Sequence, residues 1–167
     1  QIFSVTNLHR IMPPSMRDIL FGIVQVEPEY DGMGKRELLD EHFAPDQFIQ
    51  DTDKKVIITW TDIDYDKPRL CLSWDEKSGG EFLVRDILDA TSAAPGYFPF
   101  VEFKDRSGRE YRGVDGALFA NDPTDIAVMK VIEDVGNPGE IKVLSLGTGT
   151  VPGHWDGKKI HKKAGGI

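Results

Sequence analysis

Strand-like and helix-like segments alternate in the second half of this 167-residue chain, and this alternation constrains the fold more than any other feature. Residues 110–114 read as a strand, residues 123–135 as a helix that a proline opens, and residues 141–146 as a short apolar strand. A continuous apolar strand is typical of a parallel sheet that is buried on both faces. We therefore predict the α/β class, with a mostly parallel sheet covered by helices on both faces.

Two more helices and a pair of strands are predicted earlier in the chain. Residues 35–43 and 84–94 place apolar side chains at helical spacing, and prolines follow both segments. Residues 55–61 and 69–74 are β-branched or alternating runs joined by a turn-rich stretch, so we expect them to pair as strands. Residues 16–26 could form a helical turn followed by a strand.

The length fits one domain, and a composition with 40% hydrophobic and 29% charged residues is typical of a globular one. The net charge of −8 argues against a nucleic-acid partner, because phosphate binding needs clustered Lys and Arg. A short basic tract over residues 158–163 is the exception. A solvated tail explains it more simply than contact with anionic lipid headgroups.

Cys71 is the only cysteine, so no intramolecular disulfide can form and the chain carries no signature of an oxidising compartment. The sequence has neither an apolar run of about 18 residues nor a signal-peptide pattern, so we expect no transmembrane segment. The four histidines lie in no metal-ligand pattern, and we expect neither a metal nor a cofactor. Cellular location stays open between the cytoplasm and export.

Residues 113–123 (GVDGALFANDP) place a single carboxylate, Asp115, on a glycine-flanked turn ahead of a helix start. Ester hydrolysis through an acyl-enzyme needs a hydroxyl nucleophile and a base within hydrogen-bond reach, and Asp115 could supply the base. Gly116 removes a side chain that would obstruct a neighbouring nucleophile or strain the turn. Taken alone, an Asp-Gly pair is more often a plain hairpin turn.

Two further segments, residues 90–99 (ATSAAPGYFP) and 143–150 (VLSLGTGT), favour the catalytic interpretation. Together with Asp115 and its motif they resemble patatin-like lipid acyl hydrolases, over roughly residues 30–150. The resemblance implies an α/β/α sandwich and a serine–aspartate dyad with Asp115 as its base. It also implies a lipid or lysophospholipid substrate, and it allows peripheral contact with a membrane surface.

The resemblance assigns supporting roles near the site as well. Gly116, Ala117 and Asn121 belong to the motif that carries the catalytic aspartate, although Asp122 stands where the family has an asparagine. Ser92 lies in a T-S-A-A-P stretch without the flanking glycines of a nucleophile elbow. We therefore expect Ser92 to support the site rather than to attack the substrate.

The chain has no G-x-S-x-G motif, so we expect the nucleophile-bearing part of the domain to precede Gln1. Residues 1–167 would then be a single partial domain, an incomplete sandwich that is inactive alone and needs an upstream segment of the same polypeptide. The absence of an initial methionine agrees with this expectation. Two alternatives stay open: a lipid-binding or regulatory module without catalysis, and a nucleotide-binding domain that uses residues 147–150 (GTGT).

Overall fold

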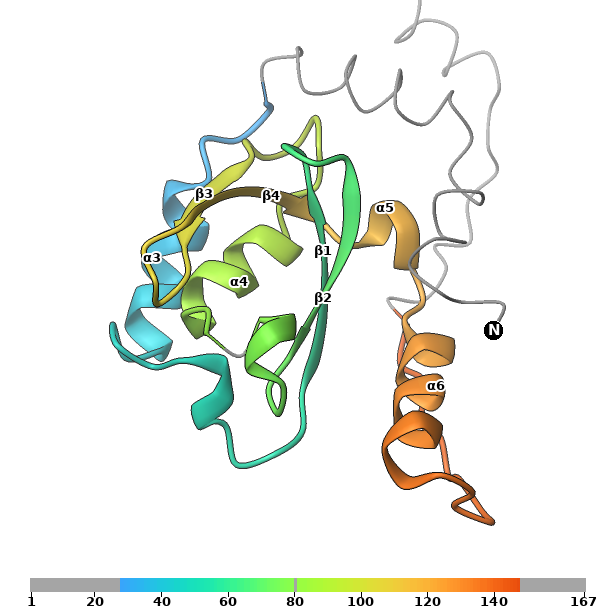
Figure 1. The fold of residues 1–167 in the computed structure, drawn as a ribbon. Helices are drawn as coiled ribbons and strands as arrows, with labels where there is room; N and C mark the ends of the chain where they lie inside the picture. Colours follow the sequence, from blue (N-terminus) through green and yellow to red (C-terminus); the bar gives the residue numbers. More distant parts are fainter. Residues whose placement is uncertain (1–27, 80, 148–167) are drawn as a thin grey trace, which may run out of the picture.

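The computed structural model describes residues 28–79 and 81–147, which form a curled four-stranded sheet with helices packed against it (Figure 1). The spatial order of the strands is β2-β1-β4-β3. Their bounds are β1 (Ile57–Asp62), β2 (Lys67–Leu72), β3 (Val101–Lys104) and β4 (Glu110–Asp115). The elements predicted over residues 16–26, the basic tract at 158–163 and residues 148–150 of the GTGT segment lie outside the described residues.

All three strand pairs of this sheet are antiparallel. Strands β1 and β2 pair from Ile57 opposite Leu72 to Asp62 opposite Lys67, and only residues 63–66 connect them. A parallel pair would need a crossover of a dozen or more residues, which this connection is too short to provide. The chain thus has an incomplete α/β fold as predicted, but the expected parallel direction does not hold for the four described strands.

Helix α4 (Val84–Thr91) occupies the hollow of the curled sheet and contacts β1, β3 and β4 (Figure 1). Its Ile87 and Ala90, both fully buried, belong to the same apolar core as Trp60 and Phe103. The Trp60 and Phe103 rings meet edge-on with centroids 5.1 Å apart, an arrangement that aromatic pairs prefer. The sheet and α4 therefore form one packed unit.

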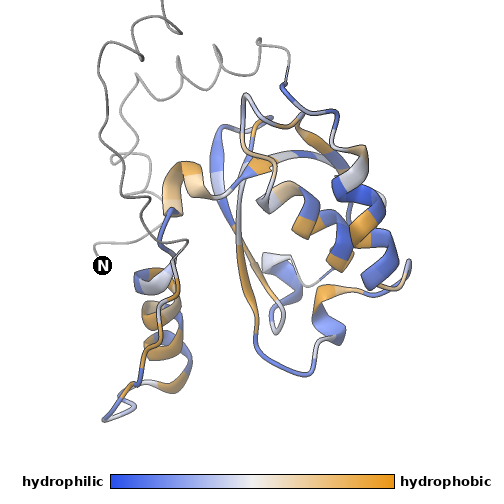
Figure 2. Ribbon diagram, turned by 180° about the vertical axis from the view of Figure 1, so that it is seen from behind, coloured by the Kyte–Doolittle hydropathy of each residue, from blue (hydrophilic) through white to orange (hydrophobic). Residues whose placement is uncertain are grey.

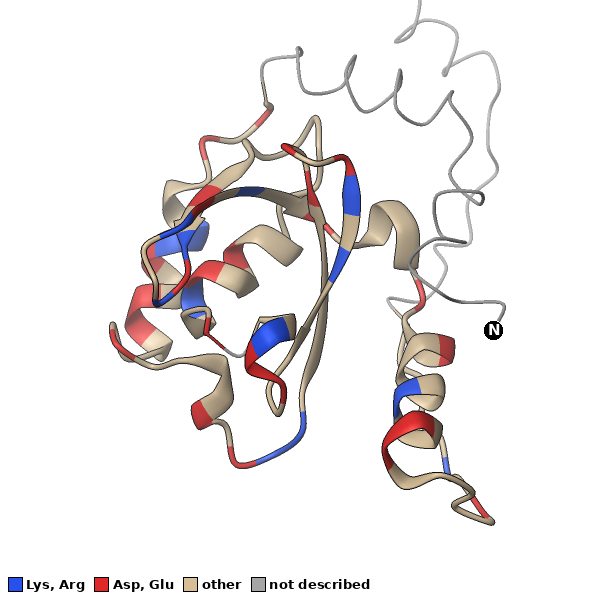
Figure 3. Ribbon diagram, viewed as in Figure 1, with Lys and Arg blue, Asp and Glu red and all other residues tan. Residues whose placement is uncertain are grey.

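Helix α3 (Met33–His42) packs on α4 and is held there by ion pairs; Figure 3 shows the charged segments of the two helices side by side. Arg36 Nη2 lies 2.6 Å from Asp86 Oδ1, and Lys35 Nζ lies 2.9 Å from Asp89 Oδ1. Both aspartates are buried, so water and salt screen these pairs less than ordinary surface pairs. Two 3₁₀ helices, η1 (Ile49–Asp51) and η2 (Glu76–Ser78), complete this part of the fold.

After β4 the chain leaves the sheet through α5 (Ala117–Ala120) and α6 (Thr124–Val135), which lies apart from the core (Figure 2). No residue of α6 is buried. Residues 141–147 form no strand, contrary to the prediction, and Leu144 and Leu146 are 83% and 84% exposed. A strand needs a hydrogen-bonded neighbour, and none of the described strands pairs with this segment.

The other predicted elements of this part of the chain are confirmed, with small shifts at their ends. The predicted helices correspond to α3, α4 and α6, and the predicted strands to β1, β2 and β4. Strand β3 and the short helix α5 were not predicted.

Candidate active site

Asp115 is the last residue of β4, at the point where the chain turns towards α5. It lies opposite Trp60 in the β1–β4 pairing. Its amide donates a hydrogen bond to the carbonyl oxygen of Ala93 at 3.1 Å, and its own carbonyl oxygen accepts one from Thr61 Oγ1 at 3.1 Å. Contacts from two other segments therefore hold the backbone of Asp115.

The carboxylate of Asp115 has one engaged oxygen and one available oxygen. Oδ1 accepts a hydrogen bond from the amide of Ala117 at 2.8 Å, which orients the side chain at the start of α5. No group within residues 28–79 and 81–147 donates a hydrogen bond to Oδ2, and the residue is partly exposed. A general base needs this arrangement, a fixed carboxylate with an oxygen that can accept a proton.

Gly116 packs directly against β1. A Cβ atom at this position would lie 2.2 Å from the carbonyl oxygen of Thr59, well inside van der Waals contact. Its φ of −70° is one that any residue adopts. Glycine is therefore required by the approach of two backbones, and not by the strained turn that the sequence suggested.

The two remaining residues of the motif lie at the ends of short elements. Ala117 opens α5 and supplies the amide that holds the Asp115 carboxylate. Asn121 follows α5, is exposed, and makes no side-chain hydrogen bond within the described part of the chain. It makes no hydrogen bond with Asp115 in this part of the chain.

Asp122 hydrogen-bonds to Thr124, the first residue of α6. Its Oδ1 accepts hydrogen bonds from the hydroxyl of Thr124 at 2.5 Å and from the amide of Thr124 at 3.0 Å. These bonds, that of the hydroxyl above all, lower the pKa of the Asp122 carboxyl. The side chain of Asp122 therefore supports the first turn of α6.

Ser92 makes no hydrogen bond with Asp115. Its hydroxyl donates to the carbonyl oxygens of Leu88 at 2.7 Å and of Asp89 at 3.2 Å, and it thereby closes the last turn of α4. The structure therefore places Ser92 at a helix end, where its hydroxyl is already engaged.

Four residues that the sequence did not single out support the site. Ala93 binds the Asp115 amide, Thr61 binds the Asp115 carbonyl, and Thr91 Oγ1 donates to the carbonyl oxygen of Thr59 at 2.6 Å. The A-T-S-A-A-P segment signalled the neighbourhood of Thr91 and Ala93. No sequence pattern distinguishes the two β1 threonines from other strand residues.

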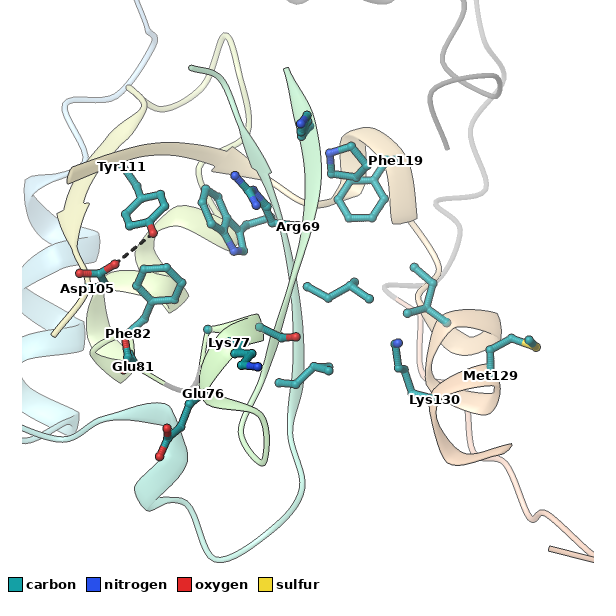
Figure 4. A pocket seen from close by; sticks show the side chains of 18 of the residues that line it. Arg69, Glu76, Lys77, Glu81, Phe82, Asp105, Tyr111, Phe119, Met129 and Lys130 are labelled. Atoms are coloured by element: carbon teal, nitrogen blue, oxygen red, sulfur yellow. Dashed lines mark hydrogen bonds between the residues drawn. The ribbon is translucent and has the colours of Figure 1, made fainter. Parts of the chain in front are cut away.

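A cavity of about 650 Å³ opens on both sides of the edge strand β2 (Figure 4). Phe82 and Tyr111 line it on one side of the strand, and Phe119 and Met129 line it on the other. Asp115 is not among the lining residues. The cavity is therefore separate from the candidate base.

Within the residues that the structure describes, no group of three or more His, Cys, Asp or Glu side chains is placed to hold a metal ion. No helix in this part of the chain is both long and apolar enough to cross a membrane.

The sequence model of a family described as Patatin-like phospholipase matches residues 5–128. Patatin-like protein 2 of Arabidopsis thaliana is 31% identical over 140 residues, which cover 73% of this chain and 34% of that protein. Patatin-like protein 1 of Oryza sativa subsp. indica is 30% identical over 173 residues, which cover 89% of this chain and 41% of that protein. Patatin-like protein 1 of Arabidopsis thaliana is 33% identical over 141 residues, which cover 74% of this chain and 34% of that protein.

The chain thus spans about a third to two-fifths of the length of these curated relatives. The region matched by the family model includes all four strands and Asp115 with its motif. On this coverage, the chain belongs to the patatin-like phospholipase family.

Proposed function

We propose that the polypeptide containing this chain is a lipid acyl hydrolase and that Asp115 is the base of its serine–aspartate dyad. The geometry of the carboxylate carries the proposal, because Oδ1 is held by the Ala117 amide at 2.8 Å and Oδ2 has no donor in the described structure. Family membership supports a lipid ester as the substrate class. The substrate would be a phospholipid or lysophospholipid, met at the surface of a membrane or micelle.

The reaction proceeds in two steps that use the same carboxylate. A serine hydroxyl attacks the acyl carbonyl while Asp115 takes its proton, and the lipid alcohol leaves with that proton as the acyl-enzyme forms. Water, deprotonated by Asp115, then attacks the acyl-enzyme; the serine–acyl bond breaks, the fatty acid is released, and Asp115 returns the proton to the serine oxygen. The serine oxygen has to lie within about 2.6–3.2 Å of the carboxylate oxygen.

In this proposal the serine and the oxyanion donors come from another part of the polypeptide. The 167 residues contain no G-x-S-x-G motif, and the hydroxyl of Ser92 is engaged at the end of α4. The isolated chain is therefore expected to be inactive, and an upstream segment is expected to complete the site.

A fluorophosphonate probe, which labels activated serines, tests the proposal. The full-length polypeptide should be labelled at one serine and should release fatty acid from phosphatidylcholine micelles, whereas the isolated chain should do neither. Labelling of the isolated chain would place the nucleophile inside these residues and contradict the role of an upstream serine. Lipid binding by the full-length polypeptide without labelling or turnover would indicate a regulatory module and overturn the hydrolase proposal.

A further inference from the structure

Thr61 is a polar residue at the centre of the sheet with 0% of its surface exposed. It lies on β1 opposite Val114 of β4. A buried hydroxyl costs stability unless it is hydrogen-bonded, and valine would occupy the same strand position without that cost. The role of Thr61 should therefore be found in the hydrogen bond that its hydroxyl makes.

The hydroxyl of Thr61 acts on the backbone of the proposed base. Oγ1 donates to the carbonyl oxygen of Asp115 at 3.1 Å, and this carbonyl belongs to the peptide plane between Asp115 and Gly116. The amide of Asp115, in the preceding peptide plane, donates to the carbonyl oxygen of Ala93 at 3.1 Å. The two bonds fix the planes on both sides of the Asp115 Cα, and so they fix the direction of its Cα–Cβ bond.

We propose that Thr61 is a positioning residue for Asp115 and sets the direction in which the carboxylate faces the attacking serine. The inference rests on the proposed function, because that function gives Asp115 its role as base. A base has to lie within about 2.6–3.2 Å of the oxygen whose proton it takes. A displacement of about 1 Å costs on the order of 10²-fold in rate, so one hydrogen bond at the peptide plane of the base is enough to matter.

The test measures kcat and KM of the full-length polypeptide on a phosphatidylcholine substrate. Thr61→Val removes the hydroxyl at nearly constant volume and should lower kcat by about 10-fold or more, with KM unchanged within about twofold. Thr61→Ser restores a hydroxyl and should bring kcat back to within about threefold of the parent. A residue with a purely structural role would not give this separation of kcat from KM or this rescue.

Ser73→Ala is the matched control. Ser73 is 8% exposed, and its hydroxyl accepts a hydrogen bond from the Val56 amide at 3.0 Å and donates one to the Lys54 carbonyl at 3.3 Å. The substitution removes a buried hydroxyl of the same kind beyond the Ile57 end of β1. It should lower the melting temperature as Thr61→Val does while leaving kcat unchanged.

The possible outcomes distinguish a failure of the positioning role of Thr61 from a failure of the proposed function. Parental kcat in Thr61→Val, or an equal loss of kcat in Ser73→Ala, would overturn the positioning role and leave Asp115 as the base. Parental turnover in Asp115→Asn would instead overturn the proposed function. If Thr61→Val does not fold, Thr61→Cys, whose thiol is a weaker donor, replaces it under the same kcat criterion.

Discussion

Gly116 approaches Thr59 so closely that a Cβ atom on the glycine would lie 2.3 Å from the threonine Oγ1, in addition to overlapping its carbonyl oxygen. This contact joins the end of β4 to the middle of β1. Since Asp115 immediately precedes the glycine, the contact also sets where the proposed base emerges from the sheet.

Gly116→Ala should destabilise the fold by about 3 kcal/mol or more, because the new methyl group meets backbone atoms that cannot move independently of β1. Gly34→Ala is the control, since an added Cβ there meets no atom within 4 Å and the residue lies in α3. The control should stabilise the fold by about 0.5–1 kcal/mol. Urea unfolding followed by tryptophan fluorescence measures both, and similar values for the two variants would show that the close approach is wrong.

The ion pair between Asp62 and Arg69 provides a second prediction. Asp62 is fully buried, and Arg69 Nη2 and Nε lie 2.8 and 3.1 Å from its Oδ2. Arg69→Met keeps the apolar stem but leaves a buried charge without its partner, which should cost about 3 kcal/mol. Lys104→Met breaks a pair with Glu110 that is equally short, at 2.9 Å, but exposed.

The exposed pair should contribute no more than about 1 kcal/mol. Denaturant unfolding of the two methionine variants therefore compares an ion pair whose carboxylate is buried with one that is exposed on both sides. If Arg69→Met lowered the free energy of unfolding by an equally small amount, this would contradict the buried position of Asp62 in the structure.

The thiol of Cys71 should be unreactive in the folded protein. It is fully buried, and burial raises its pKa to about 12, so almost none of it is thiolate at pH 8. A disulfide reagent at that pH should label the single cysteine slowly in the native protein and rapidly in urea. Because the folded pKa is raised, the stability that this shift contributes is present below about pH 9 and is lost towards pH 12. Rapid native labelling would contradict the buried position.

Local patterns in the sequence were sufficient to predict most of the elements. The helical spacing over residues 84–94 and the turn-rich stretch between β1 and β2 both act over short distances, and α4 and the β1–β2 pair confirm them. The direction of the strands, and whether residues 141–147 form a strand at all, depend instead on which other strands they pair with. An apolar run does not contain that information.

In the candidate site, too, local features could be predicted from the sequence and contacts between distant segments could not. The motif around Asp115 could be found in the sequence because its glycine and its helix start are local features. The roles of Thr61 and Ala93 could not, since each contacts Asp115 from a distant part of the chain. Gly116 could be singled out from the sequence, but the structural reason for a glycine there is its close approach to Thr59, which no local pattern connects to it.

The central claim is that Asp115 takes the proton of an attacking serine, and the turnover of Asp115→Asn in the full-length polypeptide tests it most directly. Asp122→Asn, which changes an exposed aspartate at the start of α6, is the matched control. Phospholipid hydrolysis by Asp115→Asn should fall about 10²- to 10⁴-fold with the circular dichroism spectrum unchanged, while the control keeps parental turnover. Parental turnover in a folded Asp115→Asn enzyme would contradict the account.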